Sequence, residues 1–144
     1  MNIPGHLAVA LAEHYYLSPT CLPDKQVRVI STLLLASLFP DIVDKTIGYV
    51  FRAMPNGRHY SHNLFSLVGL SLAVSLVWGR TLGLAWFLGH LGHLLADSTS
   101  QVPWLFPAVD YEFQRGQLRF EPVQLMRETV FLALVLVIRQ TSRG

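Results

Sequence analysis

Two apolar runs without a formally charged side chain, joined by a very short connection, limit the folds open to this chain. Residues 64–78 and 82–96 contain no Lys, Arg, Asp or Glu, and only three residues lie between them. Each run is long enough for about four helical turns. A connection this short brings consecutive helices back side by side. The pattern therefore predicts an antiparallel helical hairpin.

The N-terminal part of the chain predicts a second hairpin of the same kind. Apolar patterns at 5–17 and 25–39 indicate two helices, with a turn rich in proline and polar residues at 18–24. Pro40 is expected to end the second helix, because proline lacks a backbone N–H and restricts the residue before it.

The C-terminal third of the chain predicts a loop followed by one more helix. Residues 98–121 are rich in proline and aromatic side chains, and residues 111–120 alternate in a way that also fits a small β-hairpin. A helix is expected over 122–139, with a proline in its first turn. The predicted fold is thus an all-α, compact bundle of about five helices in a single domain, 1–144.

The composition favours apolar surroundings. Hydrophobic residues make up 51% of the chain and charged residues 14%, with a mean hydropathy of +0.39, whereas soluble domains are about 25% charged. Low charge and apolar helices favour membrane association, with a candidate transmembrane helix, over a fully soluble bundle. The run beginning at residue 64 is nevertheless just short of the roughly 17–25 residues that a span requires.

Charge and cysteine usage exclude several classes of protein. A net charge of +2 with scattered basic residues is not typical of a nucleic-acid-binding protein. The single cysteine, Cys21, excludes a disulfide framework and a cysteine zinc motif. No basic residue precedes Lys25, so we expect no cleaved signal peptide.

Histidines and aspartates border the apolar helices. His93 and Asp97 are one helical turn apart and share a face, with His90 one turn earlier. An imidazole and a carboxylate so placed can share a metal ion, or the carboxylate can hold the imidazole in one tautomer. The alternative is a buried His–Asp hydrogen bond that only stabilises a pair of helices.

Both hairpins bring such groups to the same end of the bundle. His62 precedes the first central helix and Asp97 follows the second, each roughly 26 Å from the turn at 1.5 Å per residue. In the N-terminal hairpin, His6 opens one helix, and Asp41 and Asp44 close the next. The topology therefore gathers imidazoles and carboxylates at one pole.

A mixed set of nitrogen and oxygen ligands suits a divalent transition metal ion such as zinc, iron or manganese, with zinc the first expectation. Unpaired carboxylates beside apolar helices would otherwise be costly. The alternative is that Asp41 and Asp97 only cap helices. The expected metal ligands are His6, Asp41, His62, His93 and Asp97.

Two further roles concern catalysis. Asp97 or Asp44 is expected to act as a general base or to orient a ligating imidazole. Arg58 is expected either to contact an anionic substrate or to form a salt bridge with Asp41 or Asp44. Among the remaining histidines, we expect His59 to be exposed or to support the site.

Four short motifs in order resemble the membrane-bound metal-dependent hydrolase family of the inner-membrane type, which is similar in motif logic to zinc-dependent phospholipase C. They are Gly5-His6-Leu7, Leu38-Phe39-Pro40-Asp41-Ile42-Val43-Asp44-Lys45, Gly57-Arg58-His59-Tyr60-Ser61-His62 and Gly92-His93-Leu94-Leu95-Ala96-Asp97. The resemblance extends to residue 107 and implies metal or site roles for the same five ligands, with Asp44 and Arg58 nearby. It departs from the usual Pro-Asp-x-Asp-His pattern, because the second Asp comes one residue later, at Asp44, and Lys45 follows it. Gly57 also stands where that family commonly has a histidine.

The leading hypothesis is a metal-dependent hydrolase of the inner membrane, acting on an ester or phosphoester, with an anionic or ester substrate such as a membrane lipid. The metal would lower the pKa of a water and polarise the scissile group. Residues 104–106 would cover the site or rest in the lipid interface. The alternatives are a non-catalytic membrane protein with a structural His/Asp cluster, and a metal-binding or transport component.

Overall fold

The structure is a computed structural model that describes residues 2–17, 23–98, 102–113, 115–116 and 121–141. The described residues form helices and irregular segments without a β-strand, so the all-α prediction is confirmed. The elements are α1 (Ile3–Leu17), α2 (Pro23–Lys45), a π-helical turn η1 (Thr46–Val50), α3 (Leu64–Trp78), α4 (Arg80–Ala96) and α5 (Pro122–Thr141).

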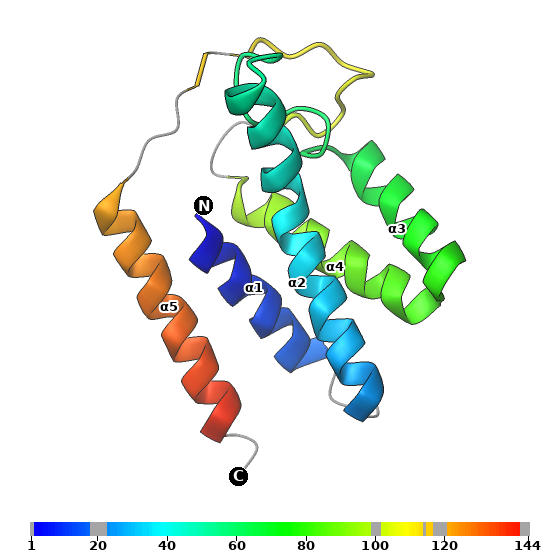
Figure 1. Ribbon diagram of the computed structural model, residues 1–144, viewed down its shortest axis with the longest axis vertical. Helices are drawn as coiled ribbons and strands as arrows, with labels where there is room; N and C mark the ends of the chain where they lie inside the picture. The colour runs from blue at the N-terminus through cyan, green and yellow to red at the C-terminus, as the bar shows by residue number, and fades with distance from the viewer. Residues whose placement is uncertain (1, 18–22, 99–101, 114, 117–120, 142–144) are drawn as a thin grey trace.

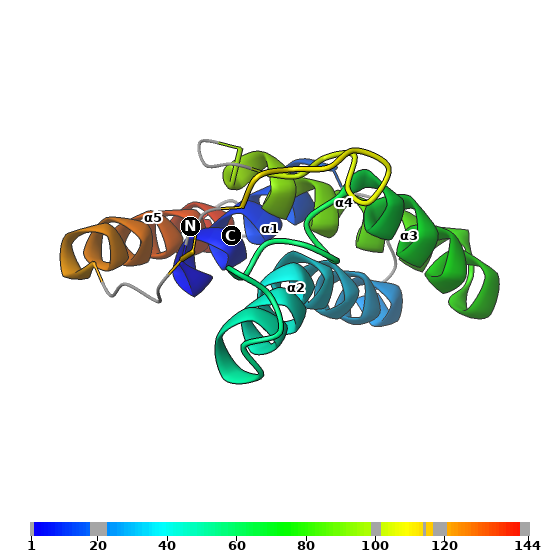
Figure 2. The same ribbon diagram turned by 90° about the horizontal axis from the view of Figure 1, so that it is seen from above.

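Helix α4 is the centre of the packing. It contacts α1, α2 and α3, while α1 also packs against α2 and α5 (Figure 1). Both predicted hairpins, α1–α2 and α3–α4, are therefore packed pairs. Seen from above, α3 and α5 lie at opposite edges of the molecule, with α1, α2 and α4 between them (Figure 2).

A single glycine makes the turn between α3 and α4. Gly79 ends one helix and starts the next with φ +97°, a backbone conformation that side chains with a Cβ rarely adopt. Its N–H donates to the carbonyl of Ser75, and its carbonyl accepts from the N–H groups of Leu82 and Gly83. This turn fixes the hairpin with almost no loop.

The prediction that Pro40 ends the second helix is wrong. Pro40 lies inside α2, which continues to Lys45. A proline inside a helix removes one backbone hydrogen bond and costs about 3 kcal/mol, so contacts made beyond it must offset that cost. Asp41 and Asp44 make those contacts, and the extra turn carries them to the end of the bundle.

The interior contains aliphatic clusters along the helices and buried polar groups at one pole. A small aliphatic cluster of Ala10, Val29, Leu33 and Ala85 joins α1, α2 and α4, and Leu67, Leu94 and Val102 form a second one. At the pole where α2 and α4 end, a set of imidazoles and carboxylates is also fully buried. They are His6, His59, His62, His90, His93, Asp44 and Asp97.

The loop after α4 lies over that pole. Trp104 packs against the cluster of Leu67, Leu94 and Val102, and its carbonyl accepts from the N–H of Leu64, the first residue of α3. Of the possible hairpin at 111–120, positions 114 and 117–120 lie outside the described residues, and positions 111–113, 115 and 116 are irregular. The described residues of the loop thus form a cover over the pole.

The sequence predicts a candidate transmembrane helix, and the described helices do not provide one. None of them is both long enough and apolar enough to cross a bilayer.

Replacing Gly89 by alanine is expected to destabilise the fold by roughly 1–3 kcal/mol, the usual cost of overpacking a core. A Cβ at this position would come within 2.3 Å of the Leu33 carbonyl oxygen, where α4 crosses α2. Chemical denaturation measures the change in the free energy of unfolding.

The matched control is Gly69→Ala on the outer side of α3, where a Cβ would meet no atom within 4 Å. That change should be neutral or stabilising by up to about 1 kcal/mol, because alanine favours helix more than glycine does. Equal effects of Gly69→Ala and Gly89→Ala would contradict the close crossing of α2 and α4.

Candidate metal centre

Four buried side chains meet at the pole where α2 and α4 end. One potential ligand atom from each of Asp41, His62, His93 and Asp97 lies within 4.8 Å of the others. The fifth expected ligand is beside them: His6 Nε2 lies 3.6 Å from Asp97 Oδ1 and 3.8 Å from Asp41 Oδ2. Its ring stacks on that of His93, with centroids 3.9 Å apart. The structure therefore brings together all five residues singled out in the sequence.

The helix directions explain this convergence. His6 lies in the first turns of α1, Asp41 lies in the last turns of α2, and His93 lies in the last turn of α4. Because α1 runs opposite to α2 and α3 runs opposite to α4, these ends share one pole (Figure 1). His62 precedes α3 by two residues, and Asp97 is the C-cap of α4.

Asp44 fixes the orientation of His62. Its Oδ2 lies 2.8 Å from His62 Nδ1 and accepts from the His59 N–H at 2.7 Å, and the Ser61 N–H also binds the carboxylate. Burial alone would raise the pKa of Asp44, but these hydrogen bonds lower it below its usual value. An ionised carboxylate only accepts, so His62 Nδ1 carries a proton and Nε2 is the atom directed at the cluster. Burial alone would lower the pKa of His62, but its hydrogen bonds to Asp41 and Asp44 raise it above its usual value in the metal-free cluster.

A backbone carbonyl fixes His93 in the same way. His93 Nδ1 lies 2.6 Å from the carbonyl oxygen of Ser37, in the turn of α2 that contains Pro40. A carbonyl can only accept, so Nδ1 is the protonated nitrogen and Nε2 has its lone pair free for the cluster. The Ser37 hydroxyl in turn donates to the carbonyl of His6, which ties α1 to the same turn.

His62 and His93 face each other through their Nε2 atoms. His93 Nε2 and His62 Nε2 are 3.1 Å apart. Two lone pairs at this distance repel unless a proton or a cation lies between them. Two nitrogens bound to one tetrahedral zinc ion, at about 2.0–2.1 Å each, would be roughly 3.3 Å apart. The arrangement fits a metal ion.

Three of the five candidate ligands have protonation states that suit metal binding. Burial lowers the pKa of His93 to about 3 and that of His6 to about 4, so both rings are neutral at pH 7. Burial alone would raise the pKa of Asp41, but the neighbouring His62 and Lys45 hold it below its usual range. Neutral imidazoles and ionised carboxylates are the forms that bind divalent ions.

Two cations lie at the rim of the cluster. Lys45 Nζ pairs with Asp41 Oδ2, and Arg58 Nη2 lies 3.0 Å from Asp97 Oδ2. The sequence suggested a salt bridge from Arg58 to Asp41 or Asp44. In the structure, the partner of Arg58 is Asp97 instead. The Arg58 side chain keeps 29% of its surface exposed, so it reaches from the cluster to solvent.

Lys45 and Gly57, where the sequence differs from the motifs that it resembles, lie against each other. A Cβ on Gly57 would come within 2.9 Å of the side chains of both Lys45 and Tyr49. A histidine at position 57 would have no room beside Lys45. The chain therefore pairs a lysine on Asp41 with a glycine that leaves space for it.

The remaining histidines near the site support its loop. His90 Nε2 donates to the Ser61 carbonyl at 2.8 Å, one residue before His62. His59 is buried, which excludes the exposed alternative and leaves the supporting one, and its ring lies 4.1 Å from that of Phe113. Phe106 also contacts His59, so the loop after α4 shields this side of the site.

Sequence reasoning missed two residues that position the site. Asn63 caps α3 through the Ser66 N–H and donates to the carbonyls of His59 and Tyr60. An asparagine just before an apolar run is a known helix-start signal and could have been noticed. Ser37 gave no such signal, because its role depends on a backbone carbonyl.

A hollow leads from the surface to Asp41. It has a volume of about 280 Å³ and mostly apolar walls. Its lining residues are Ile3, Leu38, Asp41, Ile42, Lys45 and Thr46. A ligand with an apolar part could therefore reach the edge of the cluster from this side.

Comparison with known proteins assigns the chain to a family. A family model described as YdjM inner membrane protein matches residues 1–144. The chain therefore belongs to the YdjM inner membrane protein family. No curated protein and no solved structure was found to match it.

Proposed function

We propose that this member of the YdjM inner membrane protein family is a metal-dependent hydrolase of esters or phosphoesters. The observation that carries the proposal is the pair of facing imidazole nitrogens, His62 Nε2 and His93 Nε2, 3.1 Å apart and each locked by an acceptor on its other side. These two buried nitrogens cannot both keep a bare lone pair at this distance, so a proton or a cation must lie between them. A divalent transition metal ion, with zinc the first expectation, satisfies them.

Each residue then has a distinct task. The metal ligands are Asp41, His62, His93 and Asp97, and His6 completes the set from the face that stacks on His93. When bound there, the ion supplies Lewis acidity, lowering the pKa of water and polarising the bond to be cleaved.

Asp44 is the positioning residue for His62 rather than the general base. Its oxygens are already bonded to the His62 ring and to two backbone N–H groups. Asp97, at the edge of the cluster beside Arg58, is the carboxylate placed to accept a proton from water.

Arg58 and the hollow beside Asp41 support a substrate with both a negatively charged and an apolar part. The guanidinium is partly exposed and adjoins the cluster, so it can pair with the negative charge that develops on an ester or phosphoester oxygen. The apolar walls contributed by Ile3, Leu38 and Ile42 accept a chain-bearing molecule. An ester or phosphoester lipid of the membrane combines both features.

The test is hydrolysis by the full-length protein, purified with its metal. We expect cleavage of p-nitrophenyl butyrate or bis(p-nitrophenyl) phosphate that is lost after chelation and restored by added zinc, manganese or iron. Elemental analysis should find about one transition metal ion per chain. Absence of bound metal above background, together with no metal-restored cleavage of either compound, would overturn the proposal.

A structural cluster is the rival function, and one observation favours it. Asp41, Asp44 and Asp97 already have basic partners in Lys45, His62 and Arg58, so their charges are balanced without a metal. In that case, the protein would contain no metal, and loss of a cluster residue would change only the free energy of unfolding.

Arg58→Lys is expected to lower turnover by about tenfold or more, because an ammonium cannot reproduce the planar pair of donors that a guanidinium offers a developing anion. The melting temperature should fall by only a few degrees, since the positive charge near Asp97 is kept. Steady-state kinetics and thermal unfolding measure the two effects. A large loss of stability with unchanged turnover per folded molecule would show that the Arg58–Asp97 pair is structural.

A further inference from the structure

The outer face of α3 is apolar and has no partner among the described elements. Among the helices, α3 packs only against α4, and its buried residues are Leu67, Ser71 and Val74. The opposite face exposes large apolar side chains, of which even the least exposed shows 48% of its surface. They are Phe65, Val68, Leu72, Leu76 and Val77. A continuous face of this kind marks a contact with another apolar phase.

The end of this face carries the side chains of a membrane interface. Helix α3 has no charged residue, and it ends in Trp78, which is 66% exposed. Gly79 and then Arg80 follow directly. Tryptophan favours the level of lipid headgroups, and arginine just beyond it favours their phosphates.

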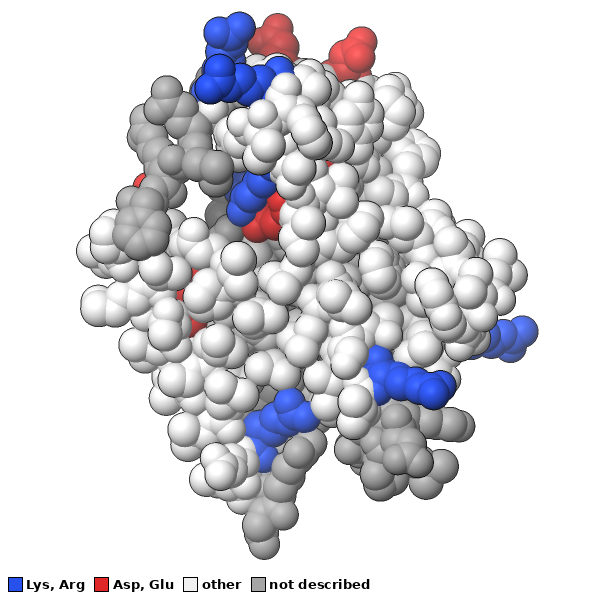
Figure 3. All heavy atoms as spheres, in the orientation of Figure 1, with Lys and Arg blue, Asp and Glu red and all other residues white. Residues whose placement is uncertain are grey.

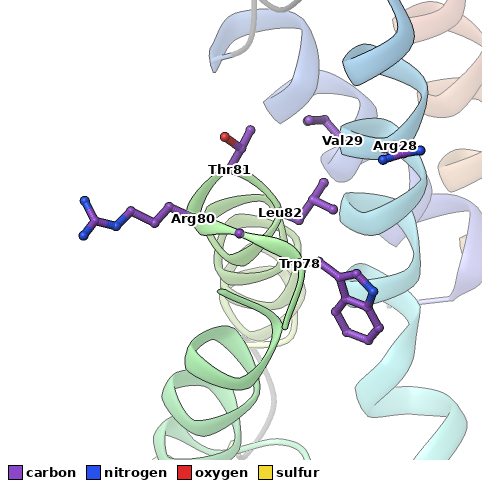
Figure 4. Close-up of a pocket in the computed structure, with 7 residues that line it drawn as sticks. Arg28, Val29, Trp78, Arg80, Thr81 and Leu82 are labelled. Carbon is purple, nitrogen blue, oxygen red and sulfur yellow. The ribbon is translucent and has the colours of Figure 1, made fainter. Parts of the chain in front are cut away.

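A hollow opens at the same turn, far from the metal centre. It has a volume of about 220 Å³ and lies between the α3–α4 turn and the first turns of α2. Figure 4 shows Leu82 and Val29 facing each other, Trp78 reaching toward α2, and Arg80 extending outward from the turn. The lining residues are Arg28, Val29, Trp78, Gly79, Arg80, Thr81 and Leu82.

The charge around this hollow is positive. Neither Arg28 nor Arg80 forms an ion pair with another described residue, and no carboxylate is among the lining residues. On the face seen in Figure 3, the lower part shows basic atoms and no acidic ones among the residues described. The hollow therefore offers two exposed cations, without an ion-pair partner among the described residues, beside an indole ring.

We propose that the hollow at the α3–α4 turn binds the phosphate group of an anionic phospholipid in a bilayer, while the outer face of α3 lies against the acyl chains. An amphiphile with a negative headgroup matches both features at once: Arg28 and Arg80, on opposite sides of the hollow (Figure 4), attract the phosphate, and Leu72 and Leu76 meet the chains. The site is independent of the metal chemistry, because His93 is roughly 20 Å along α4 from Arg80.

Tryptophan quenching by brominated lipids tests the proposal directly. The chain has three tryptophans, so the full-length W86F/W104F protein retains Trp78 as its only reporter. It is reconstituted into phosphatidylcholine vesicles that contain either brominated phosphatidylglycerol or brominated phosphatidylcholine at the same mole fraction. We expect roughly twofold stronger quenching by the anionic lipid, because the two arginines enrich it around the turn.

Three comparisons can overturn the proposal. Quenching by neither lipid would show that α3 does not face the bilayer, and equal quenching by both would show that the hollow does not select a negative headgroup. In the background of R28Q and R80Q the preference should disappear while quenching itself remains; an unchanged preference would contradict the role of the arginines. Millimolar inorganic phosphate, at matched ionic strength, should leave the preference intact, and its loss would indicate a site for a soluble anion instead.

A reporter on the opposite edge is the matched control. Leu134 on α5 is 55% exposed, and Leu134→Trp in a protein with the three native tryptophans changed to phenylalanine reports on that surface. We expect no anionic preference there, whereas the same preference at Leu134→Trp would overturn the assignment to the α3–α4 turn. Circular dichroism of each variant shows that the helices are retained.

Discussion

His93→Ala is expected to weaken metal binding by at least about 100-fold, more than the roughly 10–100-fold loss that follows removal of a group outside the ligand shell. His93 Nε2 is one of the two facing imidazole nitrogens at the centre of the cluster, and none of the other described side chains on α4 belongs to the cluster. Competition with a chromogenic chelator measures the affinity, and elemental analysis measures the bound metal. Esterase or phosphodiesterase activity should be lost in parallel.

The control for this variant is His14→Ala. His14 is also a buried histidine, but it lies two helical turns beyond His6 on α1 and is not part of the cluster. Its replacement should lower the free energy of unfolding without changing metal affinity by more than a few-fold. If His93→Ala and His14→Ala alter stability alike and neither changes the metal content, the cluster does not hold a metal ion.

Asp44→Asn is expected to have the largest effect on stability, a loss of about 3–5 kcal/mol. The amide cannot replace both carboxylate oxygens, so its NH₂ group would face a donor, either the His62 ring or the N–H groups of His59 and Ser61. Chemical denaturation of metal-free protein isolates this effect from stabilisation by bound metal.

The same change should lower metal affinity by roughly 10–100-fold, because His62 would lose the partner that orients it. Asp110→Asn, at an exposed position in the loop after α4, is the matched control and should change stability by no more than about 0.5 kcal/mol. Metal affinity that stays unchanged in Asp44→Asn while stability falls would show that Asp44 only holds the loop and does not serve the metal centre.

The helical framework was accessible from sequence because it depends on local patterns. The apolar run at 64–78 matches α3 at both ends, and the short connection at Gly79 dictates the hairpin. The end of α2 was not accessible, because the local rule for Pro40 was outweighed by contacts that form only in the folded protein. The preference of one residue is worth a few kcal/mol, and a set of buried hydrogen bonds can exceed it.

In the candidate site, too, one part was predictable from the sequence and another part was not. Helix length and antiparallel order were enough to predict that His6, Asp41, His62, His93 and Asp97 would meet, because both depend on short stretches of chain. The partners of those groups were not predictable. The Ser37 carbonyl that locks His93, and the pairing of Arg58 with Asp97, depend on how α2 and α4 cross and how the loop before α3 folds over them.

The sequence by itself therefore determined which chemical groups reach one pole of a helical bundle, since helical rise and turn length follow from neighbouring residues. Only the tertiary structure decided which nitrogen of each imidazole faces the cluster, which cation pairs with which carboxylate, and which face of α3 is left uncovered. Hydrogen bonds and burial act over a few ångströms between segments far apart in the chain, so their outcome depends on packing that no local pattern records.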